Sequence, residues 1–142
     1  MPSVSKSIDV EAPPDAAFAL ATDPSRFGEW LTIHDSWPQG EPPGTPEQGA
    51  TFVQKVKIMG MPADVSWTVQ ELDGTRLVMN GAGPMGATLS STISVTASGE
   101  GSTISYESGF DGGGLQGPMA DTVTQAAGAE LERSLNNLKG LA

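Results

Sequence analysis

The residues best suited to chemistry lie together early in the chain. The segment from Phe27 to Trp37 holds two of the three tryptophans and the only histidine, His34. Large aromatic rings beside one titratable ring are typical of the mouth of a ligand pocket, where apolar area binds and a polar group orients. An ordinary core uses the same residue types to close a lid. The segment therefore predicts either a pocket or a core cover.

His34 is the candidate catalytic residue, because histidine alone has an unperturbed pKa near neutrality. A cyclase or dehydratase would need such a base near a substrate carbonyl. It would also need a donor, such as Tyr106 or Arg26, for the developing oxyanion. Asp35 is adjacent, but neighbours on an extended segment point apart. The alternative is that His34 caps a pocket or bonds to the backbone, so its role stays open.

The sequence gives little support for a metal site or a phosphate-binding site. One histidine and no cysteine leave carboxylates as the main metal ligands, and these have no ligand spacing, so we expect no metal. The run from Gly81 to Gly86 fits G-x-G-x-x-G, but the segment after it reads as a strand, which predicts a glycine-rich hairpin. Gly112 to Gly114 precedes a helix without the Gly-Lys-Ser/Thr of a phosphate loop. We expect no cofactor.

Length and composition predict one domain spanning residues 1–142, which is long enough to bury a core without staples. The absence of cysteine excludes a disulfide framework, and the N-terminus lacks the apolar run of a secretory signal. The uncharged run from Leu77 to Gly99 is broken by glycine, proline and hydroxyl residues, so no membrane span is expected. The predicted location is the cytoplasm.

The charge balance disfavours direct nucleic-acid binding. Seven basic and seventeen acidic residues give a formal net charge of −10, which repels a phosphate backbone. Lys55 and Lys57 leave a small local basic patch open as an alternative. A basic or neutral partner fits the charge better.

Hydrophobic patterning predicts a strand, two short helices, five more strands and a long helix. The first strand alternates over Ser3 to Glu11, and Pro13-Pro14-Asp15 opens a helix that ends before Pro24. A second short helix is expected from Ser25 to about Leu31, followed by a surface loop from Pro38 to Gly49. The later elements are strands Thr51 to Ile58, Ala63 to Glu71, Arg76 to Asn80, Thr88 to Thr96 and Thr103 to Phe110, and a helix from Leu115 to about Leu138.

Alternation along these strands also predicts which residues face inward. On the first strand Val4, Lys6, Ile8 and Val10 form one row. On the later strands the predicted inward residues are Phe52, Gln54, Val56, Ile58, Val65, Trp67, Val69, Leu89, Ser91, Ile93, Val95, Ile104, Tyr106, Ser108 and Phe110. Gln54, Ser91, Tyr106 and Ser108 are polar on these faces, so they must bond to one another, to water or to something bound.

A strongly curved antiparallel sheet of six to seven strands around the C-terminal helix would bury all these faces at once, which is an α+β architecture. Small residues on that helix, including Gly128, predict either close packing or room for a ligand beneath it. Methionines are candidates for core filling or for an adaptable pocket. The residues predicted to line the pocket are Trp30, His34, Trp37, Phe52, Gln54, Trp67, Met79, Tyr106, Met119 and Val123.

Three stretches carry a resemblance to a known family: Ser7-Ile8-Asp9-Val10 with Pro13-Pro14, the segment Asp23 to Trp37, and Gly60-Met61-Pro62 leading to Trp67-Thr68. The chain resembles the START-like superfamily, also called SRPBCC or Bet v 1-like, and within it the polyketide cyclase/dehydratase type 2 branch. It is most similar to an actinobacterial group whose best-known member is described as the toxin of a type II toxin-antitoxin pair.

The resemblance implies a helix-grip fold over an apolar cavity that takes lipids, sterols, polyketides or similar molecules. The function expected from it is binding of a small apolar or amphipathic ligand, with a toxin role and an antitoxin protein as partner also implied. An enzyme of the cyclase/dehydratase type that uses His34 as acid or base is the alternative. The group supplies no catalytic residues that carry over to this chain.

Overall fold

Seven strands form one antiparallel sheet in the order β1-β7-β6-β5-β4-β3-β2. The computed structural model describes residues 3–23, 26–38, 40, 47–58, 61–83, 86–111 and 118–141, and the side chains of residues 58, 61, 118–120 and 123 fall outside this description. The strands are β1 (Ser3–Val10), β2 (His34–Ser36), β3 (Thr51–Ile58), β4 (Met61–Leu72), β5 (Arg76–Ala82), β6 (Thr88–Ser98) and β7 (Gly101–Asp111). The helices are α1 (Pro14–Ala21), α2 (Phe27–Trp30) and α3 (Pro118–Leu141).

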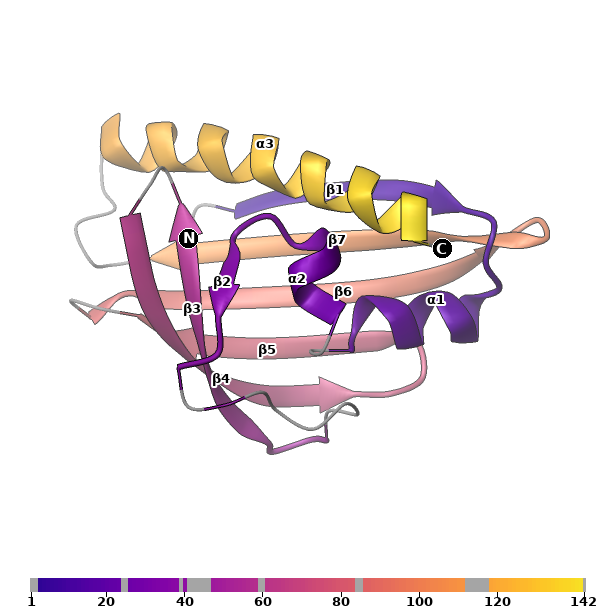
Figure 1. Ribbon diagram of the computed structural model, residues 1–142, viewed down its shortest axis with the longest axis horizontal. Helices are drawn as coiled ribbons and strands as arrows, with labels where there is room; N and C mark the ends of the chain where they lie inside the picture. The colour runs from indigo at the N-terminus through magenta and orange to yellow at the C-terminus, as the bar shows by residue number, and fades with distance from the viewer. Residues whose placement is uncertain are drawn as a thin grey trace.

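The sheet curls around α3, as the sequence predicts. Figure 1 shows α3 running along β1 and across the sheet, while β3 stands steeply to the direction of β5, β6 and β7. The short helices α1 and α2 lie on the same side of the sheet as α3 (Figure 1), and β2 is the edge strand next to β3. The helix-grip architecture and its long C-terminal helix are thereby confirmed.

Alternation predicted the buried faces well. Every inward residue predicted from Phe52 to Phe110 is buried or half-buried, apart from Ile58, whose side chain falls outside the description. Lys6 is exposed, and together with Val4 it lines a hollow between β1 and α3, so it lies on the predicted side of β1 without being buried. An exposed lysine at this position keeps its ammonium group in water.

Most elements differ by a few residues from their sequence-based bounds, and the largest differences are in the second helix and in β2. The second helix is only Phe27–Trp30, and β2 is a strand that patterning did not identify. β2 pairs with β3 through His34 opposite Val56 and Ser36 opposite Lys55, with an irregular register between them. Three residues are too few to show alternation, which explains the omission. The long helix is described over Pro118–Leu141, and its predicted start at Leu115 lies outside the described residues.

Helix α1 has sequence-encoded ends. Pro14 occupies its first turn, where a missing N–H costs nothing, and Pro13 before it is extended. At its other end the Thr22 hydroxyl donates to the Phe18 carbonyl at 2.7 Å. Ala17, Phe18, Leu20 and Ala21 are buried, so one face of the helix closes one end of the core.

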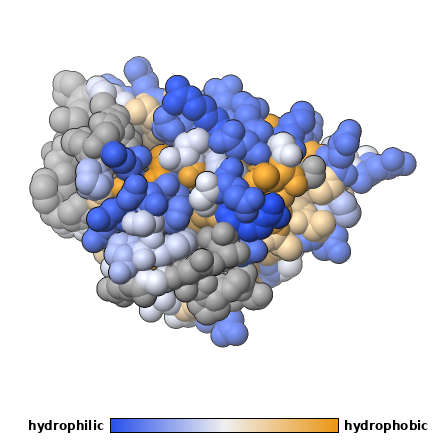
Figure 2. Space-filling view, in the orientation of Figure 1, coloured by the Kyte–Doolittle hydropathy of each residue, from blue (hydrophilic) through white to orange (hydrophobic). Residues whose placement is uncertain are grey.

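Helix α3 closes the concave side of the sheet. Leu131, Leu135 and Leu138 are 6%, 2% and 0% exposed, and they recur at the three- and four-residue spacing of one helix face. The opposite face is polar, and the view in Figure 2 is largely hydrophilic with hydrophobic residues showing between polar ones. Among the described residues no helix is both long and apolar enough to cross a bilayer.

Gly101 generates a stability prediction. A Cβ added there would overlap the backbone oxygen of Val10 and lie 3.1 Å from Cα of Glu11. Because backbone cannot swing aside, we expect Gly101→Ala to lower the free energy of unfolding by about 1–3 kcal/mol. Gly74→Ala is the matched control, since nothing lies within 4 Å of its added Cβ. Urea denaturation should show equal midpoints for control and wild type, and an undisturbed Gly101→Ala midpoint would contradict the prediction.

Candidate functional site

The aromatic segment predicted from sequence forms a ring cluster that reaches from the surface into the core. His34 and Trp37 have ring centroids 4.7 Å apart, and Trp37 meets Phe52 of β3 edge-on at 5.7 Å. Trp30 meets Tyr106 of β7 edge-on at 6.3 Å. His34, Trp37 and Phe52 are half-buried, whereas Trp30 and Tyr106 are buried. The half-buried rings form a rim, and the buried ones lie behind it.

Phe27 joins these two groups and was missed as a pocket residue. Its ring lies 5.7 Å from Trp30, 5.8 Å from Trp37 and 6.3 Å from His34. The spacing of three residues between Phe27 and Trp30 was the available signal, because it places both on one face of a helix. Phe27 is 4% exposed and so forms the floor of the cluster.

A hydrogen-bond relay connects the cluster to the sheet. The indole N–H of Trp67 donates to Oε1 of Gln54 at 3.0 Å, and Nε2 of Gln54 lies 2.9 Å from Nδ1 of His34. The three side chains come from neighbouring strands β4, β3 and β2, and each pair is diagonal across a strand boundary. Gln54 is 3% exposed, so its amide depends on these two partners.

The relay fixes the tautomer of His34. An indole N–H can only donate, so the Gln54 atom facing Trp67 must be the oxygen. The Gln54 NH₂ then faces His34 and donates, which makes Nδ1 an acceptor. The proton of the neutral ring therefore sits on Nε2. Burial lowers the pKa of His34 from its usual value, and the nearby Asp35 carboxylate opposes this more weakly. His34 is accordingly a neutral donor at physiological pH.

Gly81 holds the indole of Trp67 in place. The two residues face each other across β4 and β5, and a Cβ on Gly81 would lie 2.8 Å from Cε3 of Trp67 and 2.7 Å from Cγ1 of Val65. The indole therefore lies directly over the glycine backbone. This close approach aims the indole N–H at Gln54.

A second polar pair lies deeper in the sheet. The hydroxyl of Ser91 on β6 donates to the Tyr106 oxygen at 3.1 Å, and both residues are buried. Burial raises the pKa of Tyr106, which the Ser91 bond opposes more weakly, so the phenol stays protonated. Gln54, Ser91 and Tyr106 therefore bond to other side chains, which is one of the three possibilities predicted for the inward polar residues. Ser108 is half-buried.

Among the described residues, one buried polar side-chain atom has no hydrogen-bond partner. The indole Nε1 of Trp30 is enclosed, yet no acceptor lies within hydrogen-bond distance of it in the described part of the chain. Trp30 is 2% exposed. Leaving a buried donor unpaired costs about 1–3 kcal/mol, so such atoms are rare and demand an explanation.

Helix α3 holds the aromatic segment by polar contacts. The backbone N–H of Thr32 donates to the Ser134 hydroxyl at 3.0 Å, and the Asn137 amide donates to the Trp30 carbonyl at 3.4 Å. Ser134 also donates to the Glu130 carbonyl at 2.8 Å. The position of Trp30 therefore depends on α3.

The remaining predicted residues fall in different places. Met79 is buried on β5, and the side chains of Met119 and Val123 lie outside the described residues. Arg26 is paired with Glu29 at 2.8 Å on the surface, which removes it as an oxyanion donor. Asp35 is exposed. No group of three metal-ligating side chains occurs among the described residues.

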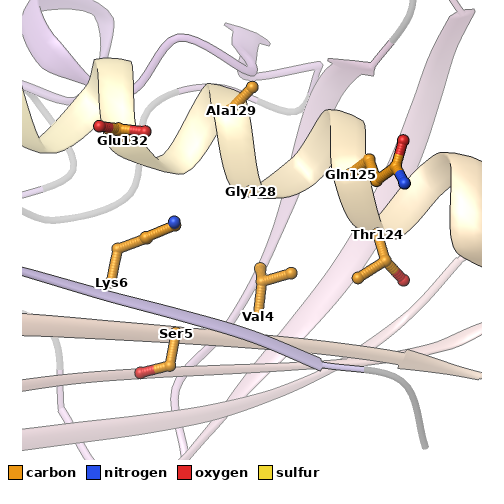
Figure 3. A pocket seen from close by; sticks show the side chains of 8 residues that line it. All are labelled: Val4, Ser5, Lys6, Thr124, Gln125, Gly128, Ala129 and Glu132. Carbon is orange, nitrogen blue, oxygen red and sulfur yellow. The ribbon is translucent and has the colours of Figure 1, made fainter.

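A separate hollow of about 450 Å³ lies between β1 and α3. Figure 3 shows Val4 and Lys6 of β1 on one side and Gly128 and Glu132 of α3 on the other. Gly128 lines this hollow. A Cβ added to it would make only an ordinary contact with Val4, at 3.9 Å, so close packing does not require glycine there. None of the predicted pocket residues lines this hollow.

The relay predicts an NMR result that the sole histidine makes unambiguous. The ¹⁵N shifts of His34 should show the Nε2–H tautomer and a pKa below the ordinary value. Trp67→Phe should raise that pKa, because a freed Gln54 amide can turn its oxygen toward a protonated ring. Trp37→Phe is the matched control and should leave the tautomer unchanged. An Nδ1–H tautomer in the wild type would refute the relay.

The family of polyketide cyclase/dehydrase and lipid transport proteins matches residues 1–142. A Mycobacterium tuberculosis protein named Toxin Rv0910 is 33% identical over 138 residues, 96% of this chain and 95% of its own. A START superfamily protein from Mycobacterium smegmatis has a TM-score of 0.77 at 18% identity, covering 98% of this chain and 95% of that one. TTHA0849 from Thermus thermophilus has a TM-score of 0.79 at 16% identity, and the match again covers 98% of this chain and 95% of that one. The fold is START-like, and the chain belongs to the polyketide cyclase/dehydrase and lipid transport family.

Proposed function

We propose that the protein binds a small apolar or amphipathic molecule between the concave face of the sheet and α3. The observation that carries this is the ring cluster, whose half-buried members His34, Trp37 and Phe52 lead to the buried Trp30 and Tyr106. A purely structural lid would gain by burying all its rings, whereas a binding site keeps some apolar area available. The lining set remains Trp30, His34, Trp37, Phe52, Gln54, Trp67, Met79, Tyr106, Met119 and Val123.

The polar groups of the site favour binding over base catalysis. Nδ1 of His34 is occupied by Gln54, and Nε2 carries the proton. A neutral ring in this state has no free lone pair to take a substrate proton, but it can donate a hydrogen bond to a ligand oxygen. The cyclase/dehydratase alternative with His34 as base would require the relay to break first.

The family supports this proposal without naming a ligand, since its description includes both cyclases and lipid transport proteins. We include in the proposal one START-like domain spanning 1–142 without a metal or cofactor. A cytoplasmic location is also part of it, because a chain without cysteine needs no oxidising compartment to fold.

Uptake of an uncharged fluorescent probe tests the binding function. We expect N-phenyl-1-naphthylamine to bind stoichiometrically, and Trp37→Ala and Phe52→Ala to weaken its binding by about tenfold each, the equivalent of roughly 1.4 kcal/mol of lost apolar contact. Leu72→Ala is the control. Leu72 is a half-buried apolar residue on β4, but it lies past the last β4 residue that pairs with β3, outside the aromatic cluster. Native mass spectrometry of protein from its own host should also release a small molecule. If no apolar ligand changes the tryptophan fluorescence or the thermal stability of the protein, the proposal is overturned.

A toxin role is the second candidate, and the M. tuberculosis relative named as a toxin is the observation that favours it. We propose that the chain inhibits growth and that a separate antitoxin protein neutralises it. Induced expression in a related host should arrest growth, and co-expression of a neighbouring gene product should restore it. The same plasmid with an early stop codon is the control. Normal growth at high expression would reject this role.

A further inference from the structure

The outer edge of β1 is a long, regular edge of the sheet. β1 is the first strand in the sheet order, and its eight residues pair with β7 without a register shift. The edge strand on the other side, β2, has three residues and an irregular register. Among the described residues, β7 is the only backbone partner of β1. A long edge with unpaired N–H and C=O groups can accept one more strand.

The Val10 carbonyl shows which backbone groups of β1 face outward. Its oxygen lies so close to Gly101 of β7 that a Cβ on this glycine would overlap it, so this carbonyl points toward β7. The N–H and C=O groups of successive residues in a strand point to opposite edges. The outward-facing residues of β1 are therefore Ser3, Ser5, Ser7 and Asp9. This row contains no proline and no bulge, two devices that commonly protect an edge.

Two hollows border the same strand. The first, of about 450 Å³, lies between β1 and α3, where Gly128 has no side chain to fill it. Figure 3 shows Lys6 pointing toward α3 and Ser5 pointing to the other side of β1. The second, of about 530 Å³, lies at the end of β1, and Asp9 and Glu100 are among the residues that line it. A strand added to β1 would place alternate side chains beside the first hollow and the others on the convex side of the sheet.

Carboxylates predominate among the charged side chains beside this edge. Lys6 is the single basic residue of β1. Glu107 of β7 lies opposite Ser5, and Glu132 of α3 lines the first hollow. The exposed carboxylates beside the edge are Asp9, Glu11, Glu100, Glu107 and Glu132, and none of them forms a salt bridge within the described part of the chain. Together with the net charge of −10, they repel a second copy of this chain and attract a basic partner.

We infer that the outer edge of β1 binds an extended basic segment of a partner protein, which adds a further strand to the seven-stranded sheet. Backbone hydrogen bonds to the outward-facing residues of β1 hold the segment in place. Its lysine or arginine side chains meet the carboxylates on the convex side, and its small side chains enter the hollow beside Gly128. The half-buried rim of the aromatic cluster lies at the opposite edge, on β2 and β3, so this surface is independent of ligand binding.

A peptide as long as β1 tests the inference: fluorescein-Lys-Val-Lys-Thr-Lys-Val-Lys-Thr-amide, in which lysines occupy one face of an extended strand. Fluorescence anisotropy gives its Kd, and backbone amide NMR signals locate it. We expect one-to-one binding, with the largest shifts at Ser5, Ser7 and Asp9. The control peptide has the same side chains and charge but is N-methylated at every residue. It should bind at least about tenfold more weakly, because it donates no backbone hydrogen bond.

Two protein variants separate the contributions of backbone and charge. Ser7→Pro removes an N–H that points away from β7, a place where an edge strand tolerates proline, and should weaken peptide binding at least about tenfold. Uptake of N-phenyl-1-naphthylamine should stay unchanged in it. Should Ser7→Pro fail to fold, Glu107→Lys decides, with an expected loss of about threefold. Glu71→Lys on β4 makes the same charge change far from β1 in the strand order and is the matched control.

Several results would overturn the inference. These are an absence of peptide binding, equal binding of the two peptides, and amide shifts that lie away from β1. An affinity equally unchanged in Glu107→Lys and Glu71→Lys would also reject the basic partner. Dimerisation of the protein alone with the shifts at β1 would assign the edge to a second copy and reject the partner segment.

Discussion

The buried amide of Gln54 is the constraint on which the site depends. It stands on an apolar sheet face, where an unsatisfied amide would cost several kcal/mol, so both of its ends need fixed partners. Trp67 can offer only a proton, which settles the direction of the whole chain of bonds. The state of His34 follows from an indole two strands away. A single buried polar group thereby converts an apparent acid/base residue into a donor.

The same constraint reaches the fold through close packing. Trp67 can aim at Gln54 only because Gly81 leaves space for the indole, and β2 must be a strand for His34 to approach Gln54 from the other side. Helix α3 completes the arrangement by holding Thr32 and the Trp30 carbonyl. The sheet, the aromatic segment and the helix therefore fix one another's positions. A larger residue at Gly81 would displace Trp67 and so alter the hydrogen bond between Gln54 and His34.

Sequence patterning could predict the faces but not the partners. Period-two alternation placed Gln54, Trp67, Ser91 and Tyr106 inward correctly, because a pleated strand alternates whatever lies across from it. Which of them bond depends on register, and Gln54 meets Trp67 only because Phe52 is paired with Trp67 and Val65 with Gln54. No local signal encodes that register. β2 was missed for the related reason that three residues carry no period. The aromatic segment was identified by composition alone, although Phe27 was left out of the site.

Fold and chemistry carry different information here. Solved structures with TM-scores of 0.77 and 0.79 share only 18% and 16% of residues with this chain, so the helix-grip arrangement tolerates nearly complete replacement of its side chains. A shared fold therefore indicates that the sheet and helix can enclose an interior, but it does not indicate which ligand that interior binds. Recognition depends on groups that packing alone does not require. A core built only for stability would place phenylalanine at position 30, since the indole N–H adds a desolvation cost and gains no bond among the described residues. That unpaired donor is a feature of the interior that packing stability alone does not explain.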